Sequence, residues 1–365
     1  MRLAVDVSRA LGERTGVGRY VEHLLREWAR QEIPFDEVHL FAPGPIPEDL
    51  VASPRFVPRG RAFRGPFALW QGWELSRNAR KLDLLFGPAY TLPPGYRGPA
   101  VVSNLGIYEG PHAGGFPLLV ARRRSAHYRS SARRARRVIA NSESTRRDLA
   151  SHYGIPVEKI DVVVPGVDQV FRPEPDESKR ALIRRGVFGA DRRYILFVGK
   201  LSPRRHLPEL LDAVRTLPGL GLVIVGPNHL GMPVDEWIAA RGLSDRVRRR
   251  EHLDAAELSP LYAAAEAFVL PTTHEGFSFT LLEAMASGLP AVTVEHTALA
   301  PDVREAAVVL PAPDPAGLAA AVAALSDPAR HAERSAASLR CASGYSWEAT
   351  SRRTMEILAR AAGAS

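Results

Sequence analysis

Apolar and polar positions along this chain follow two alternating patterns. Short apolar runs of strand length are each followed by a longer segment in which apolar residues recur every three or four positions. The clearest such segment is 18–30, where Val21, Leu24 and Trp28 fall on one helical face. This alternation is typical of βα units, in which helices cover both faces of a parallel sheet.

The apolar runs form two series. The first comprises 2–7 (RLAVDV), 37–41 (EVHLF), 83–87 (DLLFG), 100–104 (AVVSN), 137–141 (RVIAN) and 159–164 (KIDVVV). The second comprises 193–199 (RYILFVG), 221–226 (GLVIVG), 246–251 (RVRRRE), 267–271 (AFVLP), 290–294 (PAVTV) and 306–310 (AAVVL). Between them, proline and charge dominate after Phe171, so we expect a linker near 170–178. The pattern predicts an α/β chain of two Rossmann-like parallel-sheet domains, 1–171 and 172–347, which suits a length of 365 residues.

Composition excludes several classes of protein. The single cysteine, Cys341, rules out an intramolecular disulfide and a multi-cysteine metal site. No apolar run approaches the ~18 to 20 residues that span a bilayer. The N-terminal run lacks the apolar centre of a signal peptide because Asp6 interrupts it. We therefore expect a cytoplasmic protein.

The net charge is +8, and much of the excess lies in the arginine-rich stretch 122–137. A solvated helix explains this stretch, and so does peripheral contact with an anionic membrane at its inner face or with an anionic acceptor. Nucleic acid is the weakest candidate partner. The stretch has only Tyr128 as an interleaved aromatic residue, and no recognition motif accompanies it.

The segment 271–288 (PTTHEGFSFTLLEAMASG) carries the most informative chemistry. It follows an apolar run and enters a helix near residue 279, so backbone amides at the helix start suit phosphate oxygens. Gly276 lets a ligand approach the backbone. Glu275 in the loop and Glu283 inside the helix place two carboxylates along one bound ligand. There they accept protons from hydroxyl groups, as a sugar and a ribose require.

Two glutamates separated by seven residues, followed by a small-residue helix and GLPAV (288–292), closely resemble the signature of retaining glycosyltransferase family 4. That family has the GT-B fold, in which two Rossmann-like domains face a central cleft. The resemblance implies that Glu275 binds the donor sugar near its reacting face and that Glu283 holds ribose hydroxyls. It also implies contacts to sugar or phosphate from the backbone amides of Gly276, Phe277 and Ser278.

Two other segments resemble parts of the same family. The strand that ends at Gly199 is followed by Lys200 and Arg205, which resemble the family's diphosphate clamp with arginine and lysine in swapped order. Cations there would offset the charge that develops on the leaving diphosphate. Gly16, within TGVGRY (15–20), resembles the family's glycine-rich first loop, where it would let donor diphosphate and acceptor meet.

The resemblance spans almost the whole chain. It extends to 141–144 (NSES), 164–168 (VPGVD) and 345–348 (YSWE). In GT-B enzymes the last helix returns to the first domain, so residues 348–365 are expected to join residues 1–171. The resemblance makes 1–171 the acceptor-binding domain and 172–347 the nucleotide-sugar-binding domain.

One departure concerns a His-Asp pair that many relatives carry after the fourth N-terminal strand. This chain reads SNLGIY (103–108) at that point. Asn104 and His112 are the candidates to take over contacts to the sugar or acceptor. Either the enzyme uses its donor differently, or its activity is weakened. Metal is not expected, because no D-x-D pair follows a strand and no His/Cys/carboxylate group has ligand spacing.

Together these features predict a retaining, metal-independent glycosyltransferase without a cofactor. It would move a sugar from a nucleotide diphosphate sugar to a glycan, a lipid-linked acceptor or a small molecule. Two alternatives stay open: a GT-B sugar-nucleotide epimerase or phosphorylase, and a non-catalytic protein that binds a sugar nucleotide or an anionic surface. The sequence leaves open the base and sugar of the donor, the acceptor and the oligomeric state.

Overall fold

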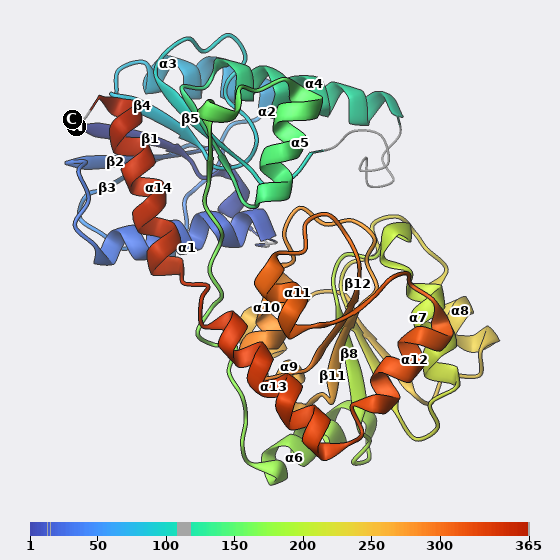
Figure 1. The fold of residues 1–365 in the computed structure, drawn as a ribbon. Helices are drawn as coiled ribbons and strands as arrows, with labels where there is room; N and C mark the ends of the chain where they lie inside the picture. The colour runs from blue at the N-terminus through green and yellow to red at the C-terminus, as the bar shows by residue number, and fades with distance from the viewer. Residues whose placement is uncertain (13, 15, 108–117, 364–365) are drawn as a thin grey trace. The chain divides into compact units, whose positions relative to one another are not determined.

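The computed structural model describes residues 1–12, 14, 16–107 and 118–363. The chain divides into two compact units. Unit 1 comprises Met1–Gly166 together with Ser346–Ser365, and unit 2 comprises Val167–Tyr345. In each unit, helices surround a sheet (Figure 1).

Unit 1 contains a seven-stranded parallel sheet in the order β3-β2-β1-β4-β5-β6-β7. Its strands are β1 (Arg2–Asp6), β2 (Glu37–Ala42), β3 (Phe56–Gly60), β4 (Leu84–Gly87), β5 (Ala100–Asn104), β6 (Arg137–Ala140) and β7 (Ile160–Val162). Six of them coincide with the apolar runs of the first series. The sequence did not predict β3, because Pro58 interrupts it. β3 lies at the edge of the sheet, where a residue without an N–H is tolerated.

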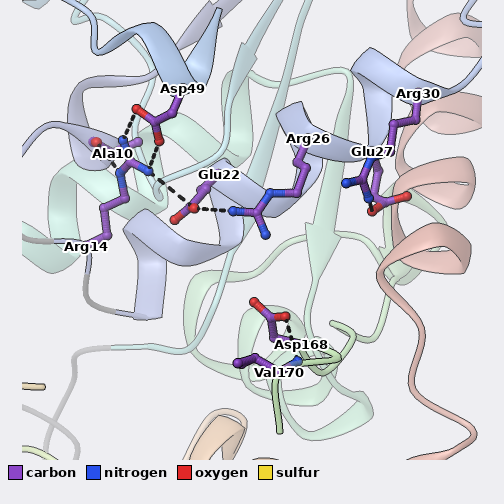
Figure 2. Close-up of polar contacts among 9 residues, drawn as sticks. All are labelled: Ala10, Arg14, Glu22, Arg26, Glu27, Arg30, Asp49, Asp168 and Val170. Atoms are coloured by element: carbon purple, nitrogen blue, oxygen red, sulfur yellow. Dashed lines mark hydrogen bonds and ion pairs between the residues drawn. The ribbon is translucent and has the colours of Figure 1, made fainter. Parts of the chain in front are cut away.

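The helices of unit 1 cover its sheet. They are α1 (Gly16–Arg30), α2 (Phe67–Leu69), a π-helical turn (Trp70–Leu75), α3 (Ser76–Ala79), α4 (Leu118–Arg134), α5 (Glu143–Tyr153) and α14 (Trp347–Ala362), with short 3-10 turns at Ser8–Ala10, Glu48–Leu50 and Val157–Lys159. The outer face of α1 carries ion pairs, in which Glu22 lies 3.3 Å from Arg14 and 2.7 Å from Arg26 (Figure 2). Pairs near the surface contribute only about 0 to 1 kcal/mol each. The buried apolar face of α1 therefore holds the helix in place.

The C-terminal helix α14 completes unit 1. Trp347, at its first position, is buried and stacks on the ring of His23 with centroids 4.4 Å apart, and it also contacts Tyr20. The hydroxyl of Thr350 donates a hydrogen bond to the carbonyl of Val164 at 2.8 Å. These contacts join the two segments of unit 1 that are farthest apart in the sequence.

Unit 2 contains a six-stranded parallel sheet in the order β10-β9-β8-β11-β12-β13. Its strands are β8 (Tyr194–Val198), β9 (Gly221–Val225), β10 (Val247–Arg250), β11 (Ala267–Leu270), β12 (Ala291–Val294) and β13 (Val308–Leu310). Each lies within an apolar run of the second series. The strand order runs outward from β8 on one side and from β11 on the other, so the direction of winding reverses between these two strands.

Eight α-helices are described in unit 2. They are α6 (Glu177–Phe188), α7 (Leu207–Arg215), α8 (Val234–Ala240), α9 (Ala255–Ala264), α10 (Phe279–Ala286), α11 (Pro301–Ala306), α12 (Pro315–Ala324) and α13 (Pro328–Ala342). A 3-10 turn, η6 (Pro203–Arg205), follows β8. Across the described residues of both units, no helix has the length and apolar character needed to cross a membrane.

The boundary between the units differs from the sequence expectation. It falls between residues 166 and 167, whereas the polar composition placed a linker at 170–178. The N–H of Val167 donates to the carbonyl of Tyr345 at 3.2 Å, and Phe171 packs edge-on against Tyr262. These contacts make the proline-rich segment part of unit 2 despite its composition. The chain returns to unit 1 at residue 346, two residues before the expected position.

Trp347 offers a test of how α14 stabilises unit 1. We expect Trp347→Ala to lower the free energy of unfolding by about 3 to 5 kcal/mol, since a buried indole is lost from a packed site. Trp73→Ala is the matched control. Trp73 is 72% exposed, so its loss should change stability by about 0.5 kcal/mol or less. Urea unfolding followed by circular dichroism measures both, and equal midpoints would contradict the role of Trp347.

Candidate functional site

The carboxyl ends of β8 and β11 meet where the winding of the second sheet reverses. The two strands are paired, with Phe268 opposite Leu196. The loops that follow them are also joined, because the N–H of Thr273 donates to the carbonyl of Arg204 at 3.0 Å. In open parallel sheets, ligands bind outside the strand ends at such a reversal. The loop after β8 carries Arg205, and the loop after β11 carries Glu275.

A glycine at the end of β8 makes room for an arginine. Gly199 has a φ of +155°, and a Cβ placed there would lie 1.2 Å from Nη1 of Arg205. The guanidinium thus occupies the space that any other side chain at position 199 would fill. Nη1 also lies 3.4 Å from the carbonyl of Val198, to which it donates a hydrogen bond. Gly199 is therefore required for the position of Arg205.

Glu275 is buried and held by two arginines. Its Oε1 lies 2.8 Å from Nη2 of Arg205 and 3.2 Å from Nη1 of Arg204, and it accepts a hydrogen bond from the hydroxyl of Thr272 at 3.4 Å. Arg204 also donates to the carbonyl of His274. Burial alone would raise the pKa of Glu275, but the charges of Arg205 and Arg204 outweigh it and hold the pKa below its ordinary value. The carboxylate is therefore ionised at neutral pH.

The cations of this site differ in part from those expected. Arg205 is buried at the site, whereas Lys200 is exposed in the same loop. The second cation that contacts the carboxylate is Arg204, which the sequence analysis did not select. Burial lowers the pKa of Arg205, yet a guanidinium in a protein stays protonated. Two positive charges and one negative charge leave the cluster with a net positive charge.

Helix α10 begins at residue 279, as expected. The remaining predicted site residues of this segment lie just before the helix or within it. Ser278 is its N-cap, but the hydroxyl is buried and has no hydrogen-bond partner among the described residues. Phe277 is half-buried and packs edge-on against Phe279, with centroids 4.9 Å apart. Gly276, which lies between Glu275 and Phe277 in the sequence, is half-buried.

Glu283 lies inside α10 and points toward α9 rather than toward solvent. It is buried, and the hydroxyl of Tyr262 on α9 lies 3.1 Å from its Oε2 and 3.1 Å from the carbonyl of Thr280. Tyr262 could not be predicted from the sequence, because α9 is separated from α10 by a strand and a loop. The ribose-binding role of Glu283 stays a prediction.

Of the two glycines in the segment 15–20 of unit 1, the local backbone requires Gly18. A Cβ at Gly18 would lie 2.5 Å from the carbonyl oxygen of Arg9, whereas Gly16 is exposed at the first position of α1. Asn104, at the end of β5, is fully buried, and neither atom of its amide has a hydrogen-bond partner among the described residues. His112, the other replacement considered for the missing histidine, lies outside the described residues. Over the described ranges, no group of three or more His, Cys, Asp or Glu side chains is arranged to hold a metal ion.

Comparison with known families accounts for most of the chain. Residues 14–171 match the family described as Glycosyltransferase Family 4, and residues 192–327 match Glycosyl transferases group 1. The chain belongs to glycosyltransferase family 4. The second match contains both Arg205 and Glu275.

Similar proteins agree with this membership. The D-inositol 3-phosphate glycosyltransferase of Thermobispora bispora is 34% identical over 244 residues, which cover 62% of this chain and 56% of that protein. The protein of the same name from Kineococcus radiotolerans is 33% identical over 253 residues, which cover 62% of this chain and 58% of that protein. The chain thus spans little more than half the length of these relatives.

Solved structures establish the fold as GT-B. The crystal structure of the Anabaena protein HepE in complex with UDP-glucose superposes with a TM-score of 0.79 at 18% identity, covering 99% of this chain and 100% of that one. Sucrose-phosphate synthase from Thermosynechococcus elongatus gives a TM-score of 0.77 at 17% identity, covering 100% of both chains. The two parallel-sheet units confirm the fold expected from the sequence.

Gly199 provides a test of the Arg205–Glu275 pair. In Gly199→Ala the new methyl group would overlap Arg205 and strain the backbone, so we expect the pair to break. The free energy of unfolding should fall by roughly 3 to 5 kcal/mol, as when a buried charge loses its partner. Gly186→Ala in α6 is the control, because a Cβ there meets nothing within 4 Å; it should gain about 0.5 to 1 kcal/mol. Chemical unfolding of both variants measures this, and an unchanged Gly199→Ala would refute the argument.

Proposed function

We propose that this family 4 chain is a glycosyltransferase that moves a sugar from a nucleotide diphosphate donor to a hydroxyl acceptor. The observation that carries the proposal is the buried carboxylate of Glu275, held by Arg204 and Arg205 at the reversal of the second sheet. An ionised carboxylate there suits sugar hydroxyls, and the net positive charge of the cluster suits a diphosphate. Crystal structures of Anabaena HepE in complex with UDP-glucose and in complex with UDP and glucose support a nucleotide-sugar donor.

The proposal assigns roles to the residues at this edge of unit 2. Glu275 would accept hydrogen bonds from the sugar, and Glu283 from the ribose. Arg205 and Lys200 would offset charge on the diphosphate, together with the backbone amides at Gly276, Phe277 and Ser278. Gly199 would contribute by making room for Arg205.

We propose further that transfer needs no metal and retains the anomeric configuration. Arginine and lysine side chains with helix-start amides would meet the charge that a metal ion meets elsewhere. Glu275 is engaged by two arginines, so it suits hydrogen bonding better than attack on the sugar carbon. The acceptor oxygen would then attack from the side of the leaving group. Its proton would pass to the departing diphosphate as the bond from C1 to the phosphate oxygen breaks.

The acceptor would bind to unit 1 through hydroxyl groups. At the carboxyl edge of its sheet, Asp6 accepts a hydrogen bond from the amide of Gln71 at 3.2 Å, and Asn104 keeps both amide atoms unpaired within the described structure. These neutral amides and a carboxylate match a polyhydroxylated molecule. Glycans, lipid-linked sugars and small polyols all meet that description. The relatives named D-inositol 3-phosphate glycosyltransferases support a small-molecule acceptor.

Donor binding is the first test of this function. We expect UDP, GDP, ADP or TDP, or one of their sugar conjugates, to raise the Tm in the presence of EDTA. A ligand at 100 times its Kd adds about 2.7 kcal/mol of stability. Glu283→Ala should abolish the shift, while Glu236→Ala, at an exposed position on α8, should keep it.

Turnover then separates the alternatives. A product with the donor's anomeric configuration by NMR supports retaining transfer, whereas an inverted product contradicts it. Donor consumption without any acceptor would favour an epimerase or phosphorylase. Tight donor binding without turnover on any acceptor would favour a sugar-nucleotide-binding protein.

We also propose a peripheral contact between α4 and an anionic membrane surface. Leu119 and Val120 are 63% and 41% exposed, and three exposed arginines follow them: Arg122, Arg123 and Arg124. The distal part of the arginine-rich stretch has a structural role instead, because Arg134 donates to three backbone carbonyls. Apolar side chains beside cations are the combination that binds anionic lipid.

Vesicle co-sedimentation tests the membrane proposal. We expect binding to vesicles that contain phosphatidylglycerol and little binding to phosphatidylcholine alone, because each basic residue near the surface adds about 1 kcal/mol. Leu119→Glu should weaken binding about tenfold. Leu182→Glu is the control, since Leu182 on α6 is 68% exposed and belongs to unit 2. Equal binding to neutral and anionic vesicles would overturn the proposal.

A further inference from the structure

Several buried polar atoms at the carboxyl edge of the second sheet have no hydrogen-bond partner among the described residues. Those that follow β8 are Ser202 Oγ and Arg205 Nε, Ser278 Oγ precedes α10, and both ring nitrogens of His296 follow β12. A buried polar group without a partner costs about 1 to 3 kcal/mol. Folded proteins rarely leave such groups unpaired, so their concentration at one edge indicates a place where a polar ligand can bind.

His296 stands out because two of its atoms are unpaired and it lies outside the family signature. It is only 5% exposed. β12 is paired with β11, with Thr293 opposite Leu270, and the hydroxyl of Thr293 donates to the carbonyl of Leu270 at 2.8 Å. His296 follows this junction by three residues, as Glu275 follows it by five, so both side chains come from loops at one end of two neighbouring strands.

Electrostatics place His296 beside the same cluster of charges. Glu275 and His296 each act on the ionisation of the other, and Arg204 acts on both. The charges of Glu295 and Arg304, which pair with each other, also act on the ionisation of the ring. Burial lowers the pKa of His296, although the carboxylates of Glu275 and Glu295 oppose that change. The ring is therefore neutral at physiological pH.

A neutral imidazole carries one N–H donor and one acceptor nitrogen. A sugar hydroxyl also donates one hydrogen bond and accepts others, so it complements such a ring on either side. The oxygens of a diphosphate only accept, and cations or N–H donors serve them better. The chemistry of His296 therefore matches the sugar rather than the diphosphate.

We propose that His296 is a specificity-determining residue that hydrogen-bonds a hydroxyl group of the donor sugar, beside the hydroxyls bound by Glu275. The inference rests on the proposed glycosyltransferase function and goes beyond it in naming what the site reads. A sugar that lacks this hydroxyl, or presents it in the wrong direction, leaves the buried ring of His296 without a hydrogen-bond partner. Such a sugar therefore binds more weakly.

Binding titrations compare nucleoside diphosphates with their sugar conjugates. The probes are UDP, GDP, ADP and TDP, each with its glucose, galactose, mannose and N-acetylglucosamine conjugates. We expect His296→Phe to bind the preferred nucleoside diphosphate as the wild type does and to bind its sugar conjugate about tenfold to a hundredfold more weakly. His296→Gln keeps an amide donor and acceptor, so it should recover part of that loss. It also carries the test if the phenylalanine variant fails to fold.

His331→Phe is the matched control. Nε2 of His331 on α13 donates a hydrogen bond to the carbonyl of Glu266, just before β11, at the opposite end of that strand. This variant should lower the Tm of the free protein. It should not change the ratio between the Kd for the nucleoside diphosphate and the Kd for its sugar conjugate.

The outcomes separate the inference from the function on which it rests. If His296→Phe binds the sugar conjugate as tightly as the wild type, or loses the nucleoside diphosphate equally, His296 does not read the sugar. A wild type that binds nucleoside diphosphates but gains nothing from any sugar also overturns the inference. A wild type that binds none of the nucleotides overturns the proposed function itself.

Discussion

The site in unit 2 depends on one buried ion pair, between Arg205 and Glu275. Removing two charges from water is costly, and their attraction compensates only when the geometry is close and further hydrogen bonds support it. Here Arg205 reaches a strand carbonyl, and Glu275 gains a second arginine and a threonine hydroxyl. The ion pair therefore holds the loop after β8 against the loop after β11. Because Arg205 occupies the space beside Gly199, the ion pair requires glycine at that position.

A consequence of this pairing is that the site is organised before any ligand binds. The carboxylate is already ionised and oriented, and an excess positive charge already lies beside it. Fixed charges need no rearrangement when substrate charge develops, which is why such sites stabilise transition states well. The same edge also carries buried polar atoms that have no hydrogen-bond partner among the described residues, including the ring nitrogens of His296. They are available to hydrogen-bond a ligand at this edge of the sheet.

The sequence predicted the architecture well because parallel strands buried on both faces must be apolar along their whole length. Helix α10 could be placed for a similar reason, since a loop glycine and a helical apolar pattern mark its start. β3 escaped because a proline is acceptable at a sheet edge, and the linker was displaced because Phe171 anchors a segment that reads as polar. Composition describes what a segment contains, whereas burial depends on what packs against it.

The site was predicted less completely, and the omissions share a cause. Glu275, Glu283 and Arg205 lie in a recognisable spacing, and the structure buries all three. Arg204 was passed over because it and Arg205 look equivalent in sequence, and only the 3-10 turn η6 directs both onto one carboxylate. Tyr262 and His296 come from a different helix and a different strand. Their proximity depends on how strands and helices pack, which no local pattern encodes.

The return of α14 to unit 1 has a consequence for how the protein is made. Unit 2 is one continuous segment, whereas unit 1 is interrupted by it and lacks Trp347 until the final helix is synthesised. As the chain emerges from the ribosome, the first 166 residues expose the surface around Tyr20 and His23 while the whole of unit 2 is still being translated. Domains fold as units during synthesis. Unit 2 is translated after most of unit 1, yet its own chain is complete before that of unit 1. The N-terminal domain is the one that needs protection from aggregation in the interval.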